Sequence, residues 1–343
     1  MRASPPGLGA LLAAALLAAP AGAATVYVGQ DGTDGPSCGA KASPCRSISR
    51  GVDVAGAGDT IRVGPGRYGD LNNDGSFDDP GDEAAEVGSG CFCVIHVDKQ
   101  VTLLSEAGAG ATVIDGNGTV GVTLVAIVAD RAVFGRANQG FTVERNGGDL
   151  AGAAIAVVAE DVTIAGNTAA ENVGTGFHIV GAHVLSDNRA RDNLTGFRII
   201  GGSSLTRNLA VSNVYGMQIE GQGAELKDDV VAANHSLGVA VMGGATDVVL
   251  TRVQVVGNGN EGIQVNAPIA VRGGRIVGND GEGMNCGVYV SAGGALDAEG
   301  VYWGSATGPG DDPADIVCAE VGTTVDTDPP GKKPGKLRLK PLK

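Results

Sequence analysis

Three polar residues in the centre of the chain carry side chains suited to acid–base chemistry: His178, Arg198 and Glu220. An imidazole accepts a proton near neutral pH, and a guanidinium stabilises negative charge as it develops. A base beside such a cation suits proton abstraction next to a carboxylate, whereas two opposed carboxylates would suit hydrolysis. Solvated positions on the protein surface explain these residues more simply, so they are candidates and the catalytic residues stay unknown.

Other polar residues of the same region are expected to share a face with these three. They are His183, Arg189, Arg191, Arg207 and His235. Glu171 and Asp192 add carboxylates that hydrolysis would need, but the sequence does not fix the distances between them.

A group of oxygen-bearing side chains nearer the N-terminus predicts a calcium site. The ligand candidates occupy alternate positions: Asp70, Asn72, Asp74, Ser76 and Asp78. Gly75 supplies the sharp bend at the sixth position, as in an EF-hand-type loop. The twelfth position is Gly81, where that loop has a bidentate Glu, so Asp82 or Glu83 would have to close the site. The ion is expected to be structural, and an acidic turn without an ion is the alternative.

The elements that position all these residues are repeats of about 20 residues. Each repeat has an Asn, a short loop, a Gly and an apolar–polar–apolar triplet, and the asparagines are Asn172, Asn193, Asn213, Asn234 and Asn258. Their separations are 21, 20, 21 and 24 residues, which is the period of a coil that buries its apolar face only by stacking on its neighbours. The sequence therefore predicts an all-β, single-domain solenoid of parallel coils.

The alternation within each triplet predicts which side chains face inwards. Two apolar stacks are expected inside the coils: Phe177, Phe197, Met217, Val239 and Ile263, with Ile179, Ile199, Ile219, Val241 and Val265 beside them. The middle position of each triplet then faces outwards and forms an external column: His178, Arg198, Gln218, Ala240 and Gln264. Adjacent members of this column are about 4.8 Å apart if neighbouring coils pair as parallel strands.

A second row of polar residues lies five positions before the first asparagines. It comprises Asn167, Asn188, Asn208 and Asp229. Asn tolerates left-handed backbone, and its amide both donates and accepts hydrogen bonds, so each row suits a coil corner and can bond to its counterpart one coil away. We therefore expect both rows to be structural, with a row of ligand-binding residues as the alternative.

Composition and charge indicate an exported protein that does not bind nucleic acid. Residues 1–23 are expected to be a signal peptide, because Arg2 precedes an apolar run, Leu8–Ala19, and the small residues Ala21-Gly22-Ala23. No later segment reaches the length that a bilayer requires. The net charge of −14 opposes binding to nucleic acid or anionic lipid. The expected location is secreted or at the cell surface, with the periplasm as an alternative.

Six cysteines in an exported chain favour disulfides over a metal cluster. Cys286 and Cys318 bracket the last coil and are expected to pair with each other. The sequence leaves the pairing of the other four open: Cys38, Cys45, Cys91 and Cys93.

The solenoid is expected to span residues 24–325, with an acidic insertion at residues 70–83. Residues 326–343 are rich in Pro, Gly and Lys and are expected to form a disordered basic tail. The tail is either a solvated terminus or an electrostatic tether to an anionic cell surface.

The repeats resemble those of right-handed parallel β-helix proteins of the pectin-lyase-like superfamily, and two flanking segments support the resemblance. Residues 57–68, Ala-Gly-Asp-Thr-Ile-Arg-Val-Gly-Pro-Gly-Arg-Tyr, are similar to the N-terminal entry of that group, where a short helix caps the first coil. Tyr302-Trp303-Gly304 with Gly308-Pro309-Gly310 is similar to the ending of the last coil. The resemblance implies a right-handed parallel β-helix with a short N-terminal capping helix, and it suggests polysaccharide chemistry.

The catalytic motifs of the superfamily's enzymes are not assembled in this sequence. Asp228-Asp229 occurs without the other elements of the polygalacturonase-like set, and the Asp-Pro-His-Asp motif of alginate epimerases and the Trp-Ile-Asp-His motif of pectate lyases are missing. We therefore expect a secreted or surface protein that binds a polysaccharide or cell-surface glycan, or serves a structural or adhesive role. The alternative is a lyase, hydrolase or epimerase acting on a uronic-acid glycan, with Arg198 neutralising the carboxylate and His178 as the base.

Overall fold

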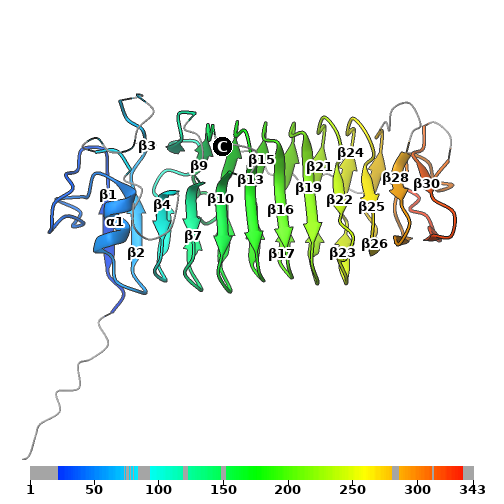
Figure 1. The fold of residues 1–343 in the computed structure, drawn as a ribbon, viewed down its shortest axis with the longest axis horizontal. Helices are drawn as coiled ribbons and strands as arrows, with labels where there is room; N and C mark the ends of the chain where they lie inside the picture. Colours follow the sequence, from blue (N-terminus) through cyan, green and yellow to red (C-terminus); the bar gives the residue numbers. More distant parts are fainter. Residues whose placement is uncertain are drawn as a thin grey trace, which may run out of the picture.

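The chain folds into three long parallel β-sheets wound around one apolar core. The computed structural model describes residues 22–72, 74, 77, 79, 81–83, 93–118, 123–147, 152–279, 286–310 and 313–334. In this part of the chain the sheets have twelve, ten and nine strands, and successive coils pair in parallel. Each coil passes from the twelve-stranded to the nine-stranded to the ten-stranded sheet (Figure 1). This is the right-handed parallel β-helix that the repeats predict.

From β2 to β29 the strands enter the three sheets in strict rotation along the chain. The twelve-stranded sheet contains β1 (Thr25–Val28), β2 (Thr60–Val63), β5 (Thr102–Ser105), β8 (Val133–Phe134), β11 (Thr163–Ala165), β14 (Val184–Ser186), β17 (Ser204–Thr206), β20 (Glu225–Lys227), β23 (Val248–Thr251), β26 (Pro268–Arg272), β29 (Ala295–Glu299) and β31 (Thr324–Asp326). The nine-stranded sheet contains β3 (Gly66–Gly69), β6 (Thr112–Asp115), β9 (Thr142–Glu144), β12 (Thr168–Ala170), β15 (Arg189–Arg191), β18 (Leu209–Val211), β21 (Val230–Ala232), β24 (Gln254–Val256) and β27 (Arg275–Val277). The ten-stranded sheet contains β4 (Cys93–Val97), β7 (Thr123–Ile127), β10 (Ala153–Val158), β13 (Thr175–Val180), β16 (Thr195–Ile200), β19 (Tyr215–Glu220), β22 (Val239–Val241), β25 (Ile263–Val265), β28 (Cys286–Val290) and β30 (Ile316–Ala319).

The predicted apolar stacks form the core. Phe177 pairs with Phe197, and Phe197 pairs with Met217 in the next coil. The rings of Phe177 and Phe197 lie 4.6 Å apart and nearly parallel, and both side chains are fully buried. Val239 and Ile263 continue the stack. Burial of one such side chain per coil supplies the stacking energy that a single coil lacks.

The external column also has the predicted register, with one departure. His178, Arg198, Gln218, Ala240 and Gln264 are successive partners in the ten-stranded sheet. Ala240 is only 2% exposed, so the expectation that every member faces solvent is wrong there. Its partners one coil away on either side are Gln218 and Gln264, whose side chains are longer than its methyl group.

The two rows of asparagines lie inside the coils as hydrogen-bonded ladders. The side-chain amide of Asn188 donates to the side-chain oxygen of Asn208 (3.0 Å), and Asn208 donates in turn to Asp229 (3.0 Å). The other row runs from Asn146 to Asp315. All members of both rows are nearly inaccessible to solvent, so the hydrogen bonds between coils account for them and their role is structural.

The backbone explanation for these rows needs correction. The left-handed conformation falls on the residue before each ladder asparagine, not on the asparagine itself. Glu171, Asp192 and Ser212 each have φ of 57°, and each precedes a member of the longer row. In each of these turns the residue with left-handed backbone comes directly before the ladder asparagine. The asparagine side chain then points into the coil and bonds the turns of the coils on either side.

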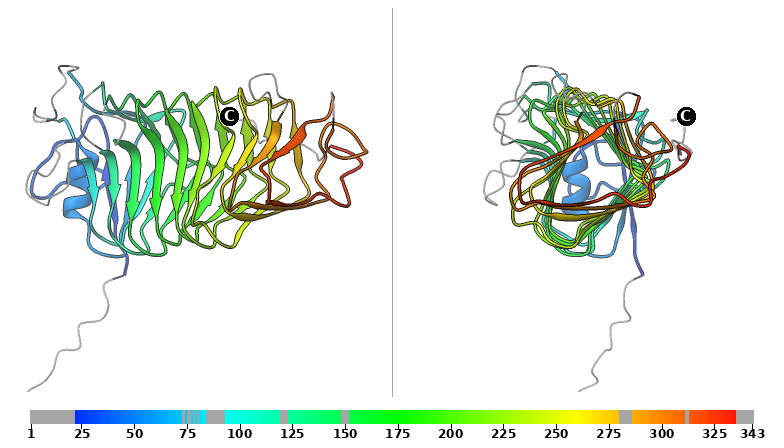
Figure 2. Two further views of the ribbon diagram at one scale, coloured as in Figure 1. Left: turned by 45° about the vertical axis from the view of Figure 1, so that its right-hand side comes forward. Right: turned by 90° about the vertical axis from the view of Figure 1, so that its right-hand side faces the viewer.

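A short helix covers the N-terminal end of the core, as predicted. Helix α1 (Ile48–Val54) lies within the outline of the coils when the molecule is viewed along its long axis (Figure 2, right). The side chain of Ser47 caps it by accepting a hydrogen bond from Arg50 N. Nearby, Cys38 and Cys45 form a disulfide. Cys93 is also disulfide-bonded, whereas Cys91 lies outside the described residues.

The C-terminal end is held by the predicted disulfide between Cys286 and Cys318, whose Cα atoms are 5.7 Å apart. The ordered region extends further than expected, because Asp326 ends a strand and Gly331 N donates to Val301 O at 2.8 Å. Residues 326–331 thus complete the last coil instead of starting a disordered tail, and residues 335–343 lie outside the described part. The predicted signal peptide falls outside it up to residue 21. No helix among the described residues is long and apolar enough to cross a membrane.

Candidate functional site

The long connections of this β-helix are concentrated on one row of turns, those that lead from the nine-stranded to the ten-stranded sheet. Near the N-terminal end they span residues 70–92, 116–122 and 145–152, and near the C-terminal end residues 278–285. The middle coils use short turns instead, beginning with residues 171–174. The described part of this row follows the upper edge of the molecule in Figure 1. Insertions on one face of a solenoid commonly mark its binding face.

Two shallow hollows lie side by side on these turns, and we call them together the turn groove. The larger has a volume of about 350 Å³ and is lined by Asn172, Val173, Asp192, Asn193, Leu194, Ser212, Val214 and His235. The smaller has a volume of about 270 Å³ and is lined by Asn117, Gly118, Arg145, Asn146, Gly147, Glu171 and Val173. Val173 belongs to both, so the two hollows are continuous across at least six coils.

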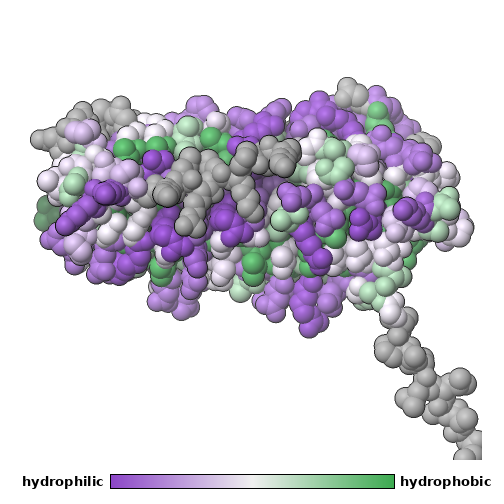
Figure 3. All heavy atoms as spheres, turned by 180° about the vertical axis from the view of Figure 1, so that it is seen from behind, coloured by the Kyte–Doolittle hydropathy of each residue, from purple (hydrophilic) through white to green (hydrophobic). Residues whose placement is uncertain are grey.

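The floor of the turn groove is an apolar row. Val173, Leu194 and Val214 each follow a ladder asparagine, and they therefore occupy the same place in successive coils. Val173 is 51% exposed and Val214 is 37% exposed. By contrast, the face seen from behind is mostly hydrophilic, with hydrophobic residues scattered over it (Figure 3). Successive exposed apolar side chains beside polar groups are typical of a ligand-binding surface.

The charged side chains of the turn groove are paired with one another. Arg191 contacts Glu171 at 2.9 Å and Asp192 at 2.8 Å. Arg145 donates from Nε to Asp115 Oδ1 at 2.8 Å. Neither guanidinium is an isolated cation that could by itself balance a polyanion, and neither Glu171 nor Asp192 is an unpaired carboxylate.

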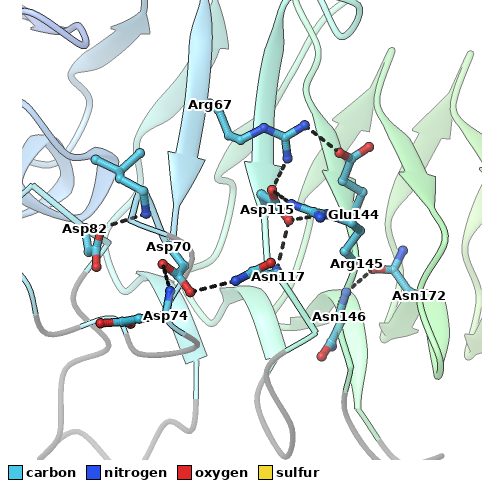
Figure 4. A network of polar contacts seen from close by, with 11 residues as sticks. Arg67, Asp70, Asp74, Asp82, Asp115, Asn117, Glu144, Arg145, Asn146 and Asn172 are labelled. Carbon is cyan, nitrogen blue, oxygen red and sulfur yellow. Dashed lines mark hydrogen bonds and ion pairs between the residues drawn. The ribbon is translucent and has the colours of Figure 1, made fainter.

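A buried carboxylate anchors the N-terminal end of the turn groove (Figure 4). The side chain of Asp115 is 1% exposed and forms ion pairs with both Arg67 and Arg145. Arg67 also reaches Glu144 at 3.1 Å, and Asn117 N donates to Asp115 Oδ1 at 2.9 Å. Two cations and a backbone donor compensate the buried charge of Asp115. The network thereby fixes Arg145 and Asn117, which line the smaller hollow.

His235 is the titratable ring of the turn groove. It is exposed, and its Nδ1 lies 3.1 Å from the backbone oxygen of Asn213. A carbonyl oxygen only accepts hydrogen bonds, so in the neutral ring Nδ1 carries the proton and Nε2 has the lone pair. His235 was expected to share a face with the other candidates, and the signal that separates it from them is its position directly after a ladder asparagine.

The three leading sequence candidates come together on the outer face of the ten-stranded sheet, outside the turn groove. His178 and Arg198 are paired residues of β13 and β16. Arg198 binds Glu220 through two contacts, Nε to Oε1 at 2.7 Å and a terminal nitrogen to Oε2 at 3.2 Å. Burial lowers the pKa of His178, and the positive charge of Arg198 lowers it further. The histidine is thus poised as a neutral base, but the arginine is already neutralised by Glu220.

The other candidates do not share this face, so that expectation was wrong. His183 is buried, and its ring lies between Val162 N (3.1 Å) and Val180 O (2.9 Å) in a turn. Arg207 is bound to Asp187 at 2.7 Å at a different corner of the coil. These candidates are near one another in the sequence, but one coil passes through all three sheets. Residues a few positions apart can therefore lie on different faces.

The predicted calcium ligands begin directly after β3. Asp70 is buried, whereas Asn72 and Asp74 are exposed; Ser76 and Asp78 lie outside the described residues. Asp74 N donates to Asp70 Oδ1 at 3.2 Å, and Asn117 Nδ2 donates to Asp70 Oδ2 at 3.0 Å. The start of the acidic insertion therefore contacts the smaller hollow of the turn groove directly (Figure 4).

Comparison with solved structures finds the same fold in three polysaccharide-related enzymes. The A-module of mannuronan C-5 epimerase AlgE6 from Azotobacter vinelandii is 17% identical, with a TM-score of 0.56 over 84% of this chain and 95% of that one. A rhamnogalacturonan lyase is 12% identical, with a TM-score of 0.61 over 88% of this chain and 86% of that one. Pectate lyase Pel9A is 13% identical, with a TM-score of 0.51 over 90% of this chain and 80% of that one.

Sequence comparison adds no relatives. No protein-family model matches the chain, and no curated protein matches it. The similarity to the three solved structures therefore establishes the architecture: the chain has the right-handed parallel β-helix fold of pectate lyase-like proteins.

Proposed function

We propose that this protein acts on a polysaccharide, which it holds in extended form along the turn groove. The observation that carries the proposal is the run of two joined hollows on the one row of turns that also bears the long connections. An extended chain of sugars matches an open groove that crosses successive coils better than a compact ligand does. The fold similarity to two lyases and an epimerase supports the same ligand class.

The lining suits the mixed surface of a sugar. Val173 and Leu194 offer apolar contact to the C–H faces of the rings, while Asn117 and Ser212 offer hydrogen-bonding groups to hydroxyls. Because Arg145 is already bound to Asp115, a polyanion gains little from it. We therefore expect the groove to accept neutral stretches of polysaccharide at least as well as anionic ones.

Glycan binding is tested with a panel of neutral and acidic polysaccharides by isothermal titration calorimetry. The double variant V173D/V214D should weaken binding at least tenfold without changing the melting temperature, because both side chains are exposed. Val184 is 52% exposed on β14, away from the groove, so V184D is the matched control and should bind normally. Binding by none of the polysaccharides, or equal loss in V184D, would refute the proposal.

A second candidate function is catalysis, as a lyase or epimerase. Two observations favour it. The neighbours in fold are described as lyases and an epimerase, and the exposed ring of His235 lines the groove with its Nδ1 bound to Asn213 O. Both reactions begin with removal of a proton next to a carboxylate, which a neutral imidazole can accept. Hydrolysis is less well supported, because Glu171 and Asp192 share one arginine, Arg191, instead of facing each other across a gap.

Catalysis is tested on the polysaccharides that bind. Lyase activity produces unsaturated ends that absorb in the ultraviolet, epimerase activity changes the NMR spectrum of the polymer, and hydrolysis produces reducing ends alone. Binding without any of the three would leave a purely binding or structural protein.

We propose that the protein works outside the cytoplasm. Five of its described cysteines are disulfide-bonded: Cys38, Cys45, Cys93, Cys286 and Cys318. Such bonds persist in oxidising compartments. The signal-like segment at residues 1–23 points the same way. Fractionation of producing cells, with free-thiol labelling of the protein, tests this directly.

A further inference from the structure

The acidic connection after β3 contains a buried carboxylate oxygen that has no hydrogen-bond partner among the described residues. Asp82 is 5% exposed, and its Oδ1 accepts a hydrogen bond from Leu71 N at 2.8 Å. Its Oδ2 is the unpartnered atom. In Figure 4 the carboxylate of Asp82 lies on the same side of the polar network as Asp70 and Asp74. A buried carboxylate with one oxygen uncompensated is costly unless a cation completes it.

The neighbouring carboxylate, Glu83, is fully accounted for by the protein. Its Oε1 accepts from Ile48 N, and its Oε2 accepts from Ser49 N at 2.7 Å and from Ser49 Oγ at 2.6 Å. These donors belong to the first turn of α1, so Glu83 caps that helix. Both oxygens of Glu83 are therefore engaged by the protein, which favours Asp82 over Glu83 as a closing ligand.

Other oxygen-bearing side chains of the same connection are hydrogen-bonded to one another. Asp74 N donates to Asn72 Oδ1 at 3.0 Å, and Asn72 Nδ2 bridges Asp74 Oδ2 at 3.0 Å and Asp79 Oδ2 at 2.5 Å. Asp70 lies beside them through its bond from Asp74 N. Carboxylate and amide oxygens, with no sulfur or imidazole among these side chains, are the ligand types that a hard cation prefers.

We propose that Asp70, Asn72, Asp74 and Asp82 bind one calcium ion, with Asp82 as the closing ligand one position later than in an EF-hand loop. Calcium is favoured over magnesium because it accepts six to eight oxygens in irregular geometry, whereas magnesium demands a near-ideal octahedron.

The ion also supports the turn groove. Asp70 Oδ2 accepts a hydrogen bond from Asn117 Nδ2 at 3.0 Å, and Asn117 lines the smaller hollow. Fixing Asp70 therefore fixes the side chain at one end of the groove. This part of the inference rests on the proposed glycan binding, whereas ion binding itself does not.

Calorimetry and thermal denaturation of the purified protein, stripped with EGTA and titrated with CaCl2 or MgCl2, test the site. We expect one calcium per chain, a rise in melting temperature of about 5 °C at saturating calcium, and much weaker binding of magnesium. D74N and D82N should each lower calcium affinity at least tenfold. D98N changes an exposed carboxylate in the turn between β4 and β5, and this variant should bind calcium as the native protein does.

Folding defects are separated from ligand loss by the calcium-free state. There D82N should melt at or above the temperature of the native protein, because it removes an uncompensated buried charge, and D74N should melt at the same temperature because Asp74 is exposed. No heat of binding and no shift in melting temperature for the native protein would overturn the proposal. So would full affinity in both variants.

The effect on the groove is measured separately, as glycan affinity with and without calcium. A calcium-dependent affinity in the native protein and a calcium-independent one in D82N is expected. Calcium binding without any change in glycan affinity would remove the link through Asn117 and leave the metal site intact.

Discussion

The side-chain amide of Asn193 donates to the side-chain oxygen of Asn213 at 2.9 Å, and the backbone N–H of Asn193 reaches the same oxygen at 3.1 Å. One oxygen thus accepts two hydrogen bonds from the coil before it. The pattern recurs along the ladder and ends at Asp315, which receives both donors of Asn279. The turns below the turn groove are therefore held in register by side chains as well as by strands.

Replacement of one ladder asparagine should lower the free energy of unfolding substantially. N193A leaves the amide of Asn172 without its acceptor at 2.8 Å and removes the donor to Ala169 O. We expect a loss of about 3 kcal/mol in the free energy of unfolding, because buried polar groups lose their partners. Urea denaturation measures it. N260A, which removes an amide that bonds Ser236 Oγ near the surface at 3.2 Å, should cost less than about 1 kcal/mol, and an equal cost would contradict the ladder's role.

The other ladder should make stability depend on pH. Burial raises the pKa of Asp229 to about 7, against the effect of its donors Asn208 and Lys227, and the charge of Asp228 raises it further. The folded protein then holds a proton that the unfolded chain releases near pH 4, so this group's contribution to stability falls as pH rises from about 4 to about 7.

D229N removes that titration. Relative to the native protein, the variant should gain up to about 1.4 kcal/mol per pH unit across this window and nothing further above it. Thermal denaturation of both proteins from pH 4.5 to 8.5 provides the measurement. A constant difference in melting temperature across the range would show that Asp229 is ionised throughout.

The pKa of His178 should shift in opposite directions when its two charged neighbours, Arg198 and Glu220, are neutralised one at a time. Arg198 lowers the pKa of His178, and Glu220 raises it. R198Q should therefore raise the pKa of His178, and E220Q should lower it, as followed by NMR titration of the imidazole. Both changes should cost less than about 1 kcal/mol of stability, because the ion pair is partly exposed. Shifts in the same direction would contradict the geometry.

Catalysis in the turn groove should depend on His235, which lines the groove, and not on His178, which lies on the ten-stranded sheet. H235Q should abolish product formation while leaving glycan affinity within about threefold, since the base acts on the transition state. H178Q is the matched control and should retain activity. The reverse result would return the site to the outer face of the ten-stranded sheet.

Sequence periodicity was sufficient to predict the fold, because stacking, inward alternation and the asparagine rows each repeat once per coil. Phe177 and Phe197 lie one over the other as the triplets predict. The turn groove was not predictable in this way. Its floor consists of single residues after each ladder asparagine, such as Val173, and its extent depends on which connections lie on the same row of turns.

The partners of individual charged side chains were also not predictable from the sequence. Glu83 and Asp82 are adjacent and chemically alike, yet one caps a helix 35 residues earlier in the chain and the other keeps an oxygen unpartnered. The sequence offers Arg198 as the cation that would neutralise a substrate carboxylate. In the structure this guanidinium is already bound by Glu220. Pairing across coils depends on side-chain reach, which spacing alone does not specify.

The short turns of the middle coils allow the length of the turn groove to vary separately from its ends. Each such coil presents the same hydrogen-bonding edge to the coil before it and the coil after it, so duplication or deletion of one unit would lengthen or shorten the surface by about 4.8 Å without disturbing the helix-capped start or the disulfide-clamped finish. Relatives that recognise longer or shorter stretches of polymer would then differ by whole repeats.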